Sequence, residues 1–181
     1  MLYLTIPKWE GWNEKEERFV SVPETKLCLE HSLVSLSRWE SKWNKPFLGR
    51  QQKTEEEMID YIRCMTITQN VPDEVYSGLT RENVNDIRKY IDAPMTATKF
   101  KEEQNEKKKS GEKITSELIY YWMIASNIPF ECQKWHLNRL LTLIRICGVK
   151  NKPPKKMGRA KNGKYQSALN AMRKERMNSR G

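Results

Sequence analysis

The chain has 181 residues, of which 38% are hydrophobic and 31% are charged, and it contains six Trp, seven Tyr and four Phe. This length suits one compact domain, alone or with an extension, and the aromatic content argues against a wholly disordered chain. No apolar run approaches the ~20 residues that cross a bilayer, and no signal peptide is recognisable, so we expect a soluble, cytoplasmic protein.

The formal net charge of +10 is concentrated at the carboxyl-terminal end. Residues 150–181 hold eleven of the 33 Lys and Arg residues and one acidic residue, Glu175, whereas residues 1–149 hold 22 basic and 22 acidic residues. The sequence therefore predicts two parts. Residues 1–149 form a compact, charge-neutral, mostly helical domain, and residues 150–181 form a basic, largely disordered tail in which 166–176 favour a short helix.

Short, partly alternating hydrophobic segments near the amino terminus predict strands. They lie at residues 2–7, 18–22 and 25–31, and we expect them to form a small antiparallel sheet. Gly11 and Asn13 are residues that favour turns, so we place a turn between the first two strands there.

Helical periodicity begins at Leu33, and that helix should end before Pro46, because the residue that precedes a proline disfavours the helical region. Thr54 and Glu57 have the spacing of a capping box, which predicts the start of a second helix.

Residues 72–79 indicate a short helix that begins at Pro72, and Thr80 is a candidate cap for the helix that follows. Residues 93–100 favour a turn and a short extended segment. Residues 101–113 contain one long run of polar and charged side chains, so we expect a mobile surface loop there.

The last helices of the domain form a predicted hairpin. Thr115 and Ser116 are candidate caps for a helix that is apolar on every side over 118–125, which predicts burial of most of its faces. A second helix should follow Pro129 and end at Gly148, a residue that suits a helix C-cap. We expect this hairpin to form the densest part of the core.

Together the elements predict an α+β fold that is predominantly helical. We expect a small N-terminal antiparallel sheet that packs on a helical bundle, followed by a flexible basic C-terminal tail. No internal repeat is recognisable in the sequence.

Two Cys/His pairs have spacings that metal ligands use. Cys28 and His31 are three residues apart, and Cys132 and His136 would share one face of a helix, so the four could form a Cys2His2 zinc site. Neither pair is a CxxC knuckle, and a buried free cysteine commonly acts as a small hydrophobic residue. Packing of these residues in the core is therefore the favoured alternative. We predict no metal and no other cofactor. The spacing of the four cysteines predicts no disulfide framework.

Catalytic motifs are not recognisable in the sequence. It contains no glycine-rich phosphate loop, no G-x-S-x-G and no HExxH. The acidic residues gather at helix starts, where the helix dipole explains them. We therefore expect a protein that is not an enzyme and has no catalytic residues.

The remaining candidate sites are contacts with partners. Trp9 and Trp12 flank a glycine in the predicted turn, so exposure and a protein contact are expected. The tail could neutralise phosphates of a nucleic acid. Its single aromatic residue, Tyr165, provides no stacking platform for bases. The alternatives are that the tail binds an acidic protein partner or is a solvated arm. The candidate contact residues of the tail are Lys150, Lys152, Lys155, Lys156, Arg159, Lys161, Lys164, Arg173, Lys174 and Arg176.

Five segments resemble small proteins from the tail-gene regions of phages of Gram-positive bacteria, described as tail assembly chaperones, and the similarity extends over almost the whole chain. The segments are LEHSLVSLSRWESKWNKPF, EMIDYIRCMTITQNV, APMTATKF, ELIYYWMIASNIPFECQKWHLNRLLTLIRIC and KNKPPKKM. The resemblance implies a mainly helical, self-associating protein that keeps the tape measure protein soluble in the host cytoplasm and delivers it to the tail tube protein. Some members also exist in a longer, frameshifted form.

No binding residue can be transferred from that family to this chain. The competing hypothesis is a nucleic-acid-binding or virion structural protein that contacts DNA or RNA through its basic tail. Neither hypothesis requires a membrane.

Overall fold

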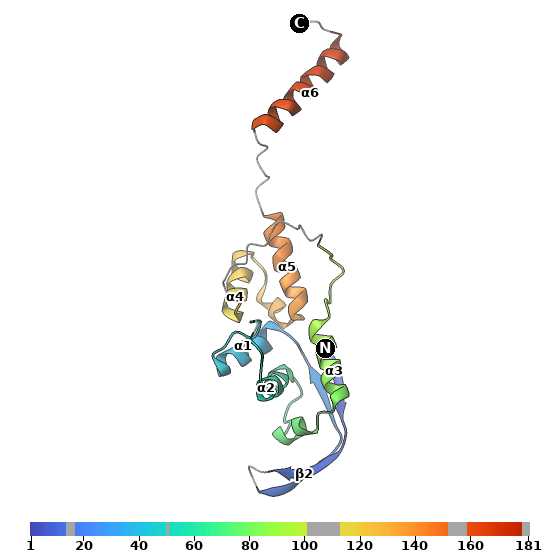
Figure 1. Cartoon of the computed structure of the whole chain (residues 1–181), viewed down its shortest axis with the longest axis vertical. Helices are drawn as coiled ribbons and strands as arrows, with labels where there is room; N and C mark the ends of the chain where they lie inside the picture. Colours follow the sequence, from blue (N-terminus) through green and yellow to red (C-terminus); the bar gives the residue numbers. More distant parts are fainter. Residues whose placement is uncertain (14–16, 50, 101–112, 152–158, 179–181) are drawn as a thin grey trace. The chain divides into compact units, whose positions relative to one another are not determined.

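The computed structural model describes residues 1–13, 17–49, 51–100, 113–151 and 159–178. It divides into two units, Met1–Gly148 and Val149–Gly181. The predicted class is confirmed, because helices and two small antiparallel sheets make up the fold (Figure 1). The predicted mobile loop at 101–113 lies outside the described residues except for its last position.

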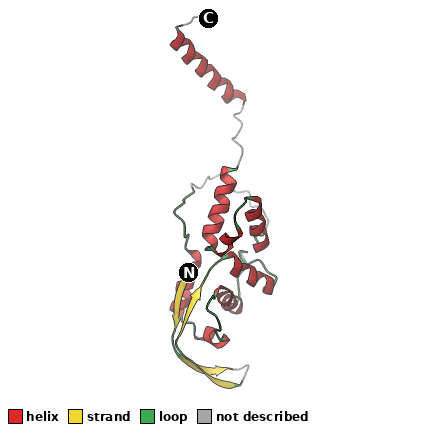
Figure 2. Cartoon of the chain, turned by 180° about the vertical axis from the view of Figure 1, so that it is seen from behind, coloured by secondary structure: helices red, strands yellow, loops and turns green. Residues whose placement is uncertain are grey.

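Four strands form one long two-stranded ribbon, which Figure 2 shows in a single colour. β1 (Leu2–Ile6) pairs with β4 (Thr25–Leu29), and β2 (Trp9–Asn13) pairs with β3 (Arg18–Val22), both antiparallel. The register is the same in both pairs, so the two sheets are successive parts of one hairpin.

The ribbon is interrupted at Pro7 and Pro23, which lie between the two paired regions. Proline has no backbone N–H for the ladder, so pairing stops where both strands carry one. The face of the ribbon that points inward also changes at this point. In β1 the buried Ile6 has an even number, whereas in β2 the half-buried Trp9 has an odd number. The ribbon therefore rotates about its own axis, and the far end presents Trp12 outward.

The turn predicted at Gly11 and Asn13 is wrong, because both residues lie inside β2. Gly11 is needed for packing: a Cβ at this position would lie 2.5 Å from Cζ3 of Trp9. The glycine therefore accommodates the indole ring of the residue two positions earlier on the same face.

Seven helices lie in or begin in the described part of the first unit, and three of them begin at the predicted caps. They are α1 (Leu33–Trp43), α2 (Glu55–Met65), the 3-10 helix η1 (Asp73–Gly78), α3 (Arg81–Asp92), α4 (Ser116–Ala125), the 3-10 helix η2 (Phe130–Lys134) and α5 (Leu137–Lys150). The capping box of Thr54 and Glu57 is confirmed, and so are the caps Thr80 and Thr115. α1 ends at Asn44, whose φ of 52° is left-handed.

The second helix of the predicted hairpin is divided in two. Residues 130–134 form η2, and α5 begins only at Leu137. The backbone N–H of Leu137, which has no acceptor within the helix, donates to the carbonyl of His31 at 2.9 Å. Gly148 does not end α5, which continues to Lys150.

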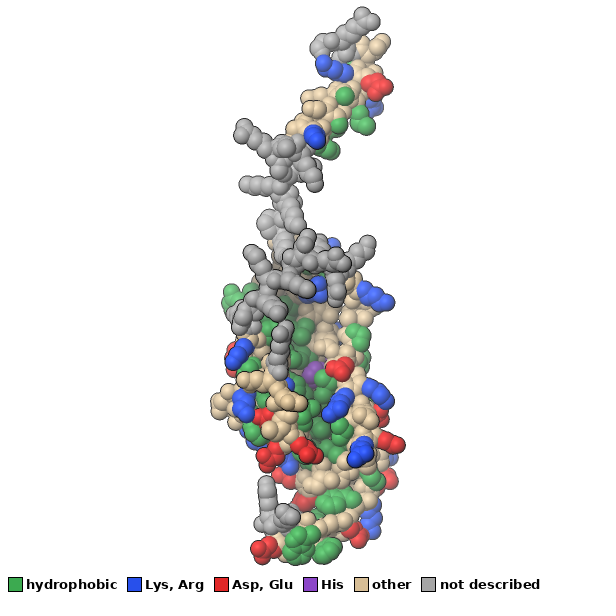
Figure 3. Space-filling model, in the orientation of Figure 1, with side chains coloured by type: hydrophobic (Ala, Val, Ile, Leu, Met, Phe, Trp, Pro, Cys, Tyr) green, Lys and Arg blue, Asp and Glu red, His purple; other side chains and the backbone are tan. Residues whose placement is uncertain are grey.

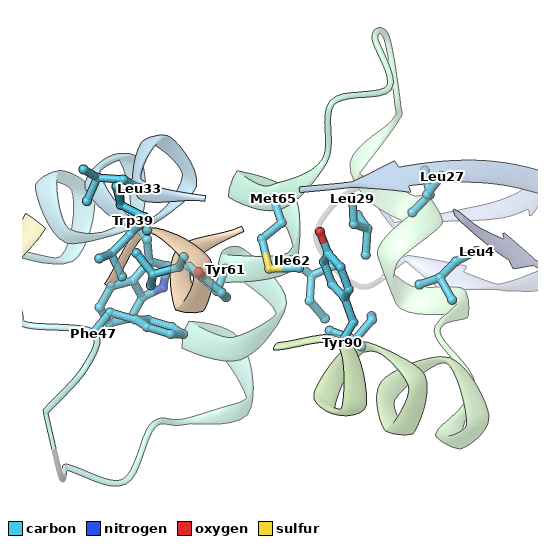
Figure 4. Packing of buried hydrophobic residues seen from close by; sticks show 14 of the residues in the cluster. Leu4, Leu27, Leu29, Leu33, Trp39, Phe47, Tyr61, Ile62, Met65 and Tyr90 are labelled. Atoms are coloured by element: carbon cyan, nitrogen blue, oxygen red, sulfur yellow. The ribbon is translucent and has the colours of Figure 1, made fainter. Parts of the chain in front are cut away.

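The prediction that the hairpin forms the densest part of the core is also wrong. Both α4 and η2 pack against α1. The fully buried large side chains come mainly from the ribbon, α1 and α2, and they include Ile6, Leu27, Leu29, Leu33, Leu36, Trp39, Tyr61 and Met65. Figure 4 shows Trp39, Phe47 and Tyr61 gathered between α1 and α2, and the sulfur of Met65 beside Ile62.

A buried carboxylate connects α1 to the start of α4. Glu40 is 6% exposed; its Oε1 accepts a hydrogen bond from the backbone N–H of Phe47 at 2.7 Å, and its Oε2 accepts one from the backbone N–H of Ser116 at 2.6 Å. A negative charge at the N-terminus of α4 also interacts favourably with the helix dipole. One side chain therefore fixes both the chain after α1 and the position of α4.

The second unit contains α6 (Arg159–Met177). The helix predicted over 166–176 thus begins seven residues earlier, since Gly163 does not interrupt a segment otherwise rich in good helix formers. Within the tail the structure describes residues 150–151 and 159–178, and Arg159–Met177 is helical. Among the described residues, no helix combines the length and the apolar character that crossing a bilayer requires.

We expect Glu40→Ala to lower the free energy of unfolding by about 3 kcal/mol, because it leaves two buried N–H groups without an acceptor. Urea unfolding measures this change. Glu55→Ala, at an exposed position in the first turn of α2, is the control and should cost much less. Equal losses in the two variants would contradict the proposed role of Glu40.

A second prediction concerns Gly78, which faces the indole of Trp9. A Cβ at Gly78 would lie 2.3 Å from Cδ1 of Trp9, so Gly78→Ala should displace the ring and cost about 1–3 kcal/mol. Gly148→Ala is the matched control, because no atom lies within 4 Å of the added methyl group, and alanine favours a helix. If both variants unfold at the same urea concentration, the packing of Trp9 on Gly78 does not fix the ribbon.

Candidate partner-binding surfaces

The four candidate zinc ligands are only partly brought together. The rings of His31 and His136 lie 5.0 Å apart between centroids, while Cys132 is buried in η2. Cys28 was expected to point inward, but it pairs with Tyr3 on the outward side of the ribbon, since Leu27 and Leu29 take the inward positions. Within the described ranges, no group of three His, Cys, Asp or Glu side chains is placed to hold a metal ion.

The spacing of Cys132 and His136 does not give the shared helical face that we expected. Cys132 lies in η2, and His136 precedes the first residue of α5, so no regular helix joins them. His136 instead forms an isolated antiparallel bridge with Ser32.

Both histidines are hydrogen-bonded within the protein. Nδ1 of His31 is 2.6 Å from Oη of Tyr61, and Nε2 of His136 is 2.9 Å from the carbonyl oxygen of Tyr90. With the bond from Leu137 to the His31 carbonyl, this group joins the end of β4 to α2, α3 and α5. Figure 3 shows a histidine side chain surrounded by hydrophobic ones on this face of the unit. We call the residues His31, Tyr61, Tyr90 and His136 the histidine junction.

The junction holds its histidines in the neutral form. Burial lowers the pKa of His31 from 6.5 to about 3, and the neighbouring His136 adds to the shift. Burial also lowers the pKa of His136, although its hydrogen bond with the Tyr90 carbonyl acts in the opposite direction. Burial raises the pKa of the Tyr61 phenol, which therefore keeps its proton.

A small hollow lies beside α2, and its lining includes Trp39, Lys45, Lys53 and Glu57. Its volume of about 30 Å³ has room for only a few water molecules. Nζ of Lys45 is 2.6 Å from Oε1 of Glu57, and this hydrogen bond lowers the pKa of the carboxyl group. The hollow is small for an organic substrate, and its Lys45 and Glu57 already pair with each other.

The two tryptophans predicted to contact a partner differ in exposure. Trp9 is half-buried against Gly78, and its Nε1 has no hydrogen-bond partner in the structure. Trp12 is 55% exposed and meets Phe19 edge to face, with ring centroids 5.6 Å apart. Figure 3 shows hydrophobic side chains at this end of the ribbon. Trp12 thus remains available for a partner, whereas Trp9 has a structural role.

The predicted contact residues of the tail are described only in part. Lys152, Lys155 and Lys156 lie outside the described residues, and Arg159 and Lys161 belong to the first turn of α6. The remaining candidates are exposed: Lys150, Lys164, Arg173, Lys174 and Arg176.

An exposed apolar face on α4 was not predicted. Ile119 and Met123 are fully buried on the side of α4 that faces the core, but Tyr121 and Ile124 are 63% and 60% exposed. Phe130 of η2 is 53% exposed. We call Tyr121, Ile124 and Phe130 the α4 face; in Figure 3 hydrophobic side chains are visible over α4 at the left edge. The expectation that α4 is buried on most sides is therefore wrong.

The α4 face is held in position from its two ends. At the start of α4, Ser116 donates its N–H to Glu40, as described above. Beyond its end, the N–H of Ile128 donates to the Met123 carbonyl at 2.9 Å, and Tyr120 donates to Oε1 of Gln133 at 2.9 Å. These bonds hold η2 beside α4, so the three exposed side chains belong to a defined surface rather than to a loose segment.

The sequence did contain one indication of this face. A helix that is apolar on every side is either buried or covered by a partner, and the sequence alone does not separate these cases. Whether such a helix is buried or left open for a partner depends on how many of its sides the rest of the chain covers.

Comparisons with protein-family models, with curated protein sequences and with solved structures gave no match.

The histidine junction makes stability depend on pH. Because the pKa of His31 is lower in the folded chain, the unfolded chain binds an additional proton between pH 6.5 and about 3. The contribution of His31 to the free energy of unfolding is therefore fully present above pH 6.5. As the pH falls below 6.5, this contribution decreases by up to about 1.4 kcal/mol per pH unit. Between roughly pH 7 and pH 5 we expect a loss of about 2 kcal/mol, measured by urea unfolding at each pH.

His31→Gln removes one of the two histidines with a lowered pKa and should reduce this pH dependence, even though it also lowers stability at neutral pH. The pH dependence that remains comes from His136, whose pKa is also lowered by burial. Carboxylates with lowered pKa values, such as Glu57, titrate below this window. An unchanged pH dependence in His31→Gln would contradict the assignment.

Proposed function

We propose that the protein is a non-enzymatic assembly factor of a long phage tail, which binds the tape measure protein and delivers it to the tail tube protein in the host cytoplasm. The observation that carries this proposal is the α4 face, with three large apolar side chains exposed on a surface held by hydrogen bonds. The sequence segments that resemble tail assembly chaperones support it, since one of them contains the whole face.

The chemistry of the α4 face suits a helical, hydrophobic partner. Burial of an exposed aromatic or branched side chain is worth about 1.5–3 kcal/mol, so three such residues can hold an apolar helix without any charge pairing. The partner is a long protein with repeated apolar stretches, and many copies of a weak binding surface can cover it. A weak contact at each copy also allows release when the tail tube protein arrives.

Exposed aromatic residues favour binding over a purely structural explanation. A tyrosine and a phenylalanine combine a large contact area with few rotatable bonds, which limits the entropy lost on binding. Interfaces are accordingly enriched in aromatic side chains at their centre. Tyr121 and Phe130 lie on either side of Ile124 in the sequence, and together they provide this composition.

The test is co-purification with the tape measure protein from the same phage genome. The double variant Tyr121→Ser/Ile124→Ser should weaken binding at least about tenfold, because two apolar contacts are lost. Its free energy of unfolding should change little, since both side chains are exposed in the free protein. Tyr3→Ser is the matched control: Tyr3 is 77% exposed on the outward side of β1, away from α4.

Three results would contradict the proposal. The double variant could retain the tape measure protein, Tyr3→Ser could lose it equally, or nuclease treatment could abolish the association. Size-exclusion chromatography with light scattering shows whether the α4 face instead joins two copies of this chain, in which case the double variant would be a monomer and tape measure binding would be unaffected.

A further inference from the structure

The start of α5 is capped by a histidine. The carbonyl of His136 accepts the first hydrogen bond of the helix, from the N–H of Leu140 at 3.1 Å, and its Nδ1 accepts one from the N–H of Asn138 at 3.3 Å. A residue that accepts hydrogen bonds in both ways occupies the N-cap position, where asparagine, aspartate and serine are the common residues. A histidine differs from these residues because its ring nitrogen accepts a hydrogen bond only while that nitrogen carries no proton.

The second nitrogen of the ring determines where the proton of the neutral histidine lies. Nε2 of His136 is 2.9 Å from the carbonyl oxygen of Tyr90, and a carbonyl only accepts, so Nε2 carries the hydrogen. Nδ1 is therefore the bare nitrogen that faces the N–H of Asn138. A further proton binds only at Nδ1, and it turns the acceptor of the cap into a donor that faces another donor.

The two contacts of the ring respond to that proton in opposite ways. The hydrogen bond to the Tyr90 carbonyl, at the end of α3, becomes stronger because its donor is then charged. The cap of α5 is lost, and a positive charge lies beside the N–H groups at the helix N-terminus, where the helix dipole opposes it. The protonated ring therefore stays on α3 and releases the first turn of α5.

Among the groups of the histidine junction, His136 is the one that water reaches. It is half-buried, whereas His31 is 2% exposed, and the two rings lie 5.0 Å apart, so a charge on one opposes a charge on the other. The Tyr90 ring is 4.9 Å away and interacts with the carboxylate of Glu30. Burial lowers the pKa of His136, and the charged amino group of Met1 lowers it further, so the ring is neutral at pH 7 and gains its proton in mild acid.

We propose that His136 is a pH-sensitive N-cap, which holds the first turn of α5 at neutral pH and opens it in mild acid while the rest of the first unit stays folded. This turn also carries Asn138, whose side chain donates to the carbonyls of Ile91 and Ala93 at 2.9 Å each. Opening of the turn therefore also frees the chain that follows α3. The device involves none of the α4 face and is independent of the tail assembly role.

The experiment is an NMR titration of the full, isotope-labelled chain from about pH 7.5 to pH 5. The amide signals of Asn138 and of the first turn of α5 should shift with the same midpoint as the ring of His136, because all of them report one proton. At the neutral end, Nδ1 should be the ring nitrogen without a proton. Both measurements use the unchanged chain, so they test the proposal even where a variant does not fold.

The variant His136→Asn replaces the ring with a cap that does not titrate, since asparagine is among the best N-cap residues. The amide signals of the first turn should then no longer shift in this pH range. His31→Gln is the matched control: it removes the other histidine and leaves the cap of α5 in place, so it should keep the shift.

The proposal is overturned if Nδ1 carries the proton of the neutral ring, or if His136 titrates while the amide signal of Asn138 does not shift. It is also overturned if His136→Asn keeps the shift. Loss of all folded signals at the midpoint would assign the effect to unfolding of the whole unit and would equally overturn it. Binding of the tape measure protein is measured at neutral pH, so failure of the tail assembly role is a separate result.

Discussion

The arrangement of the first unit depends on the backbone hydrogen bond between Leu137 and His31. It draws residue 136 out of helical geometry and fixes the start of α5 against the end of β4. The side chains at this point complete the connection, because each histidine bonds to a group on another helix. Four elements that are distant in the sequence thus meet at one buried polar group, which is costly to open because its members would lose their partners without gaining water.

This junction has a consequence for α4. If residues 130–147 formed one continuous helix, it could lie along α4 and cover a second side of it. Because the chain instead breaks at Trp135 and His136, η2 packs on α1 beside α4, and the side of α4 with Tyr121 and Ile124 stays open. The exposed surface therefore follows from the position of the break. Glu40 then prevents α4 from turning that side inward, since it holds the first N–H of the helix.

The sequence predicted the features that are decided locally. The caps at Thr54, Thr80 and Thr115 were found because a cap depends on residues three positions apart. The features that depend on distant residues were missed. Gly11 was assigned to a turn because its packing against Trp9 is not visible in the sequence, and the exposure of Tyr121 is a property of what the rest of the chain leaves uncovered. A ligand-like spacing suggested that His31 and His136 lie close together, and in the structure hydrogen bonds to Tyr61 and to the Tyr90 carbonyl hold the two rings.

The α4 face has a simple physical basis for any contact that it makes. None of its three members, Tyr121, Ile124 and Phe130, is charged, so its contribution to binding comes from the removal of apolar surface from water. Salt screens interactions between exposed charges and does not screen this contribution.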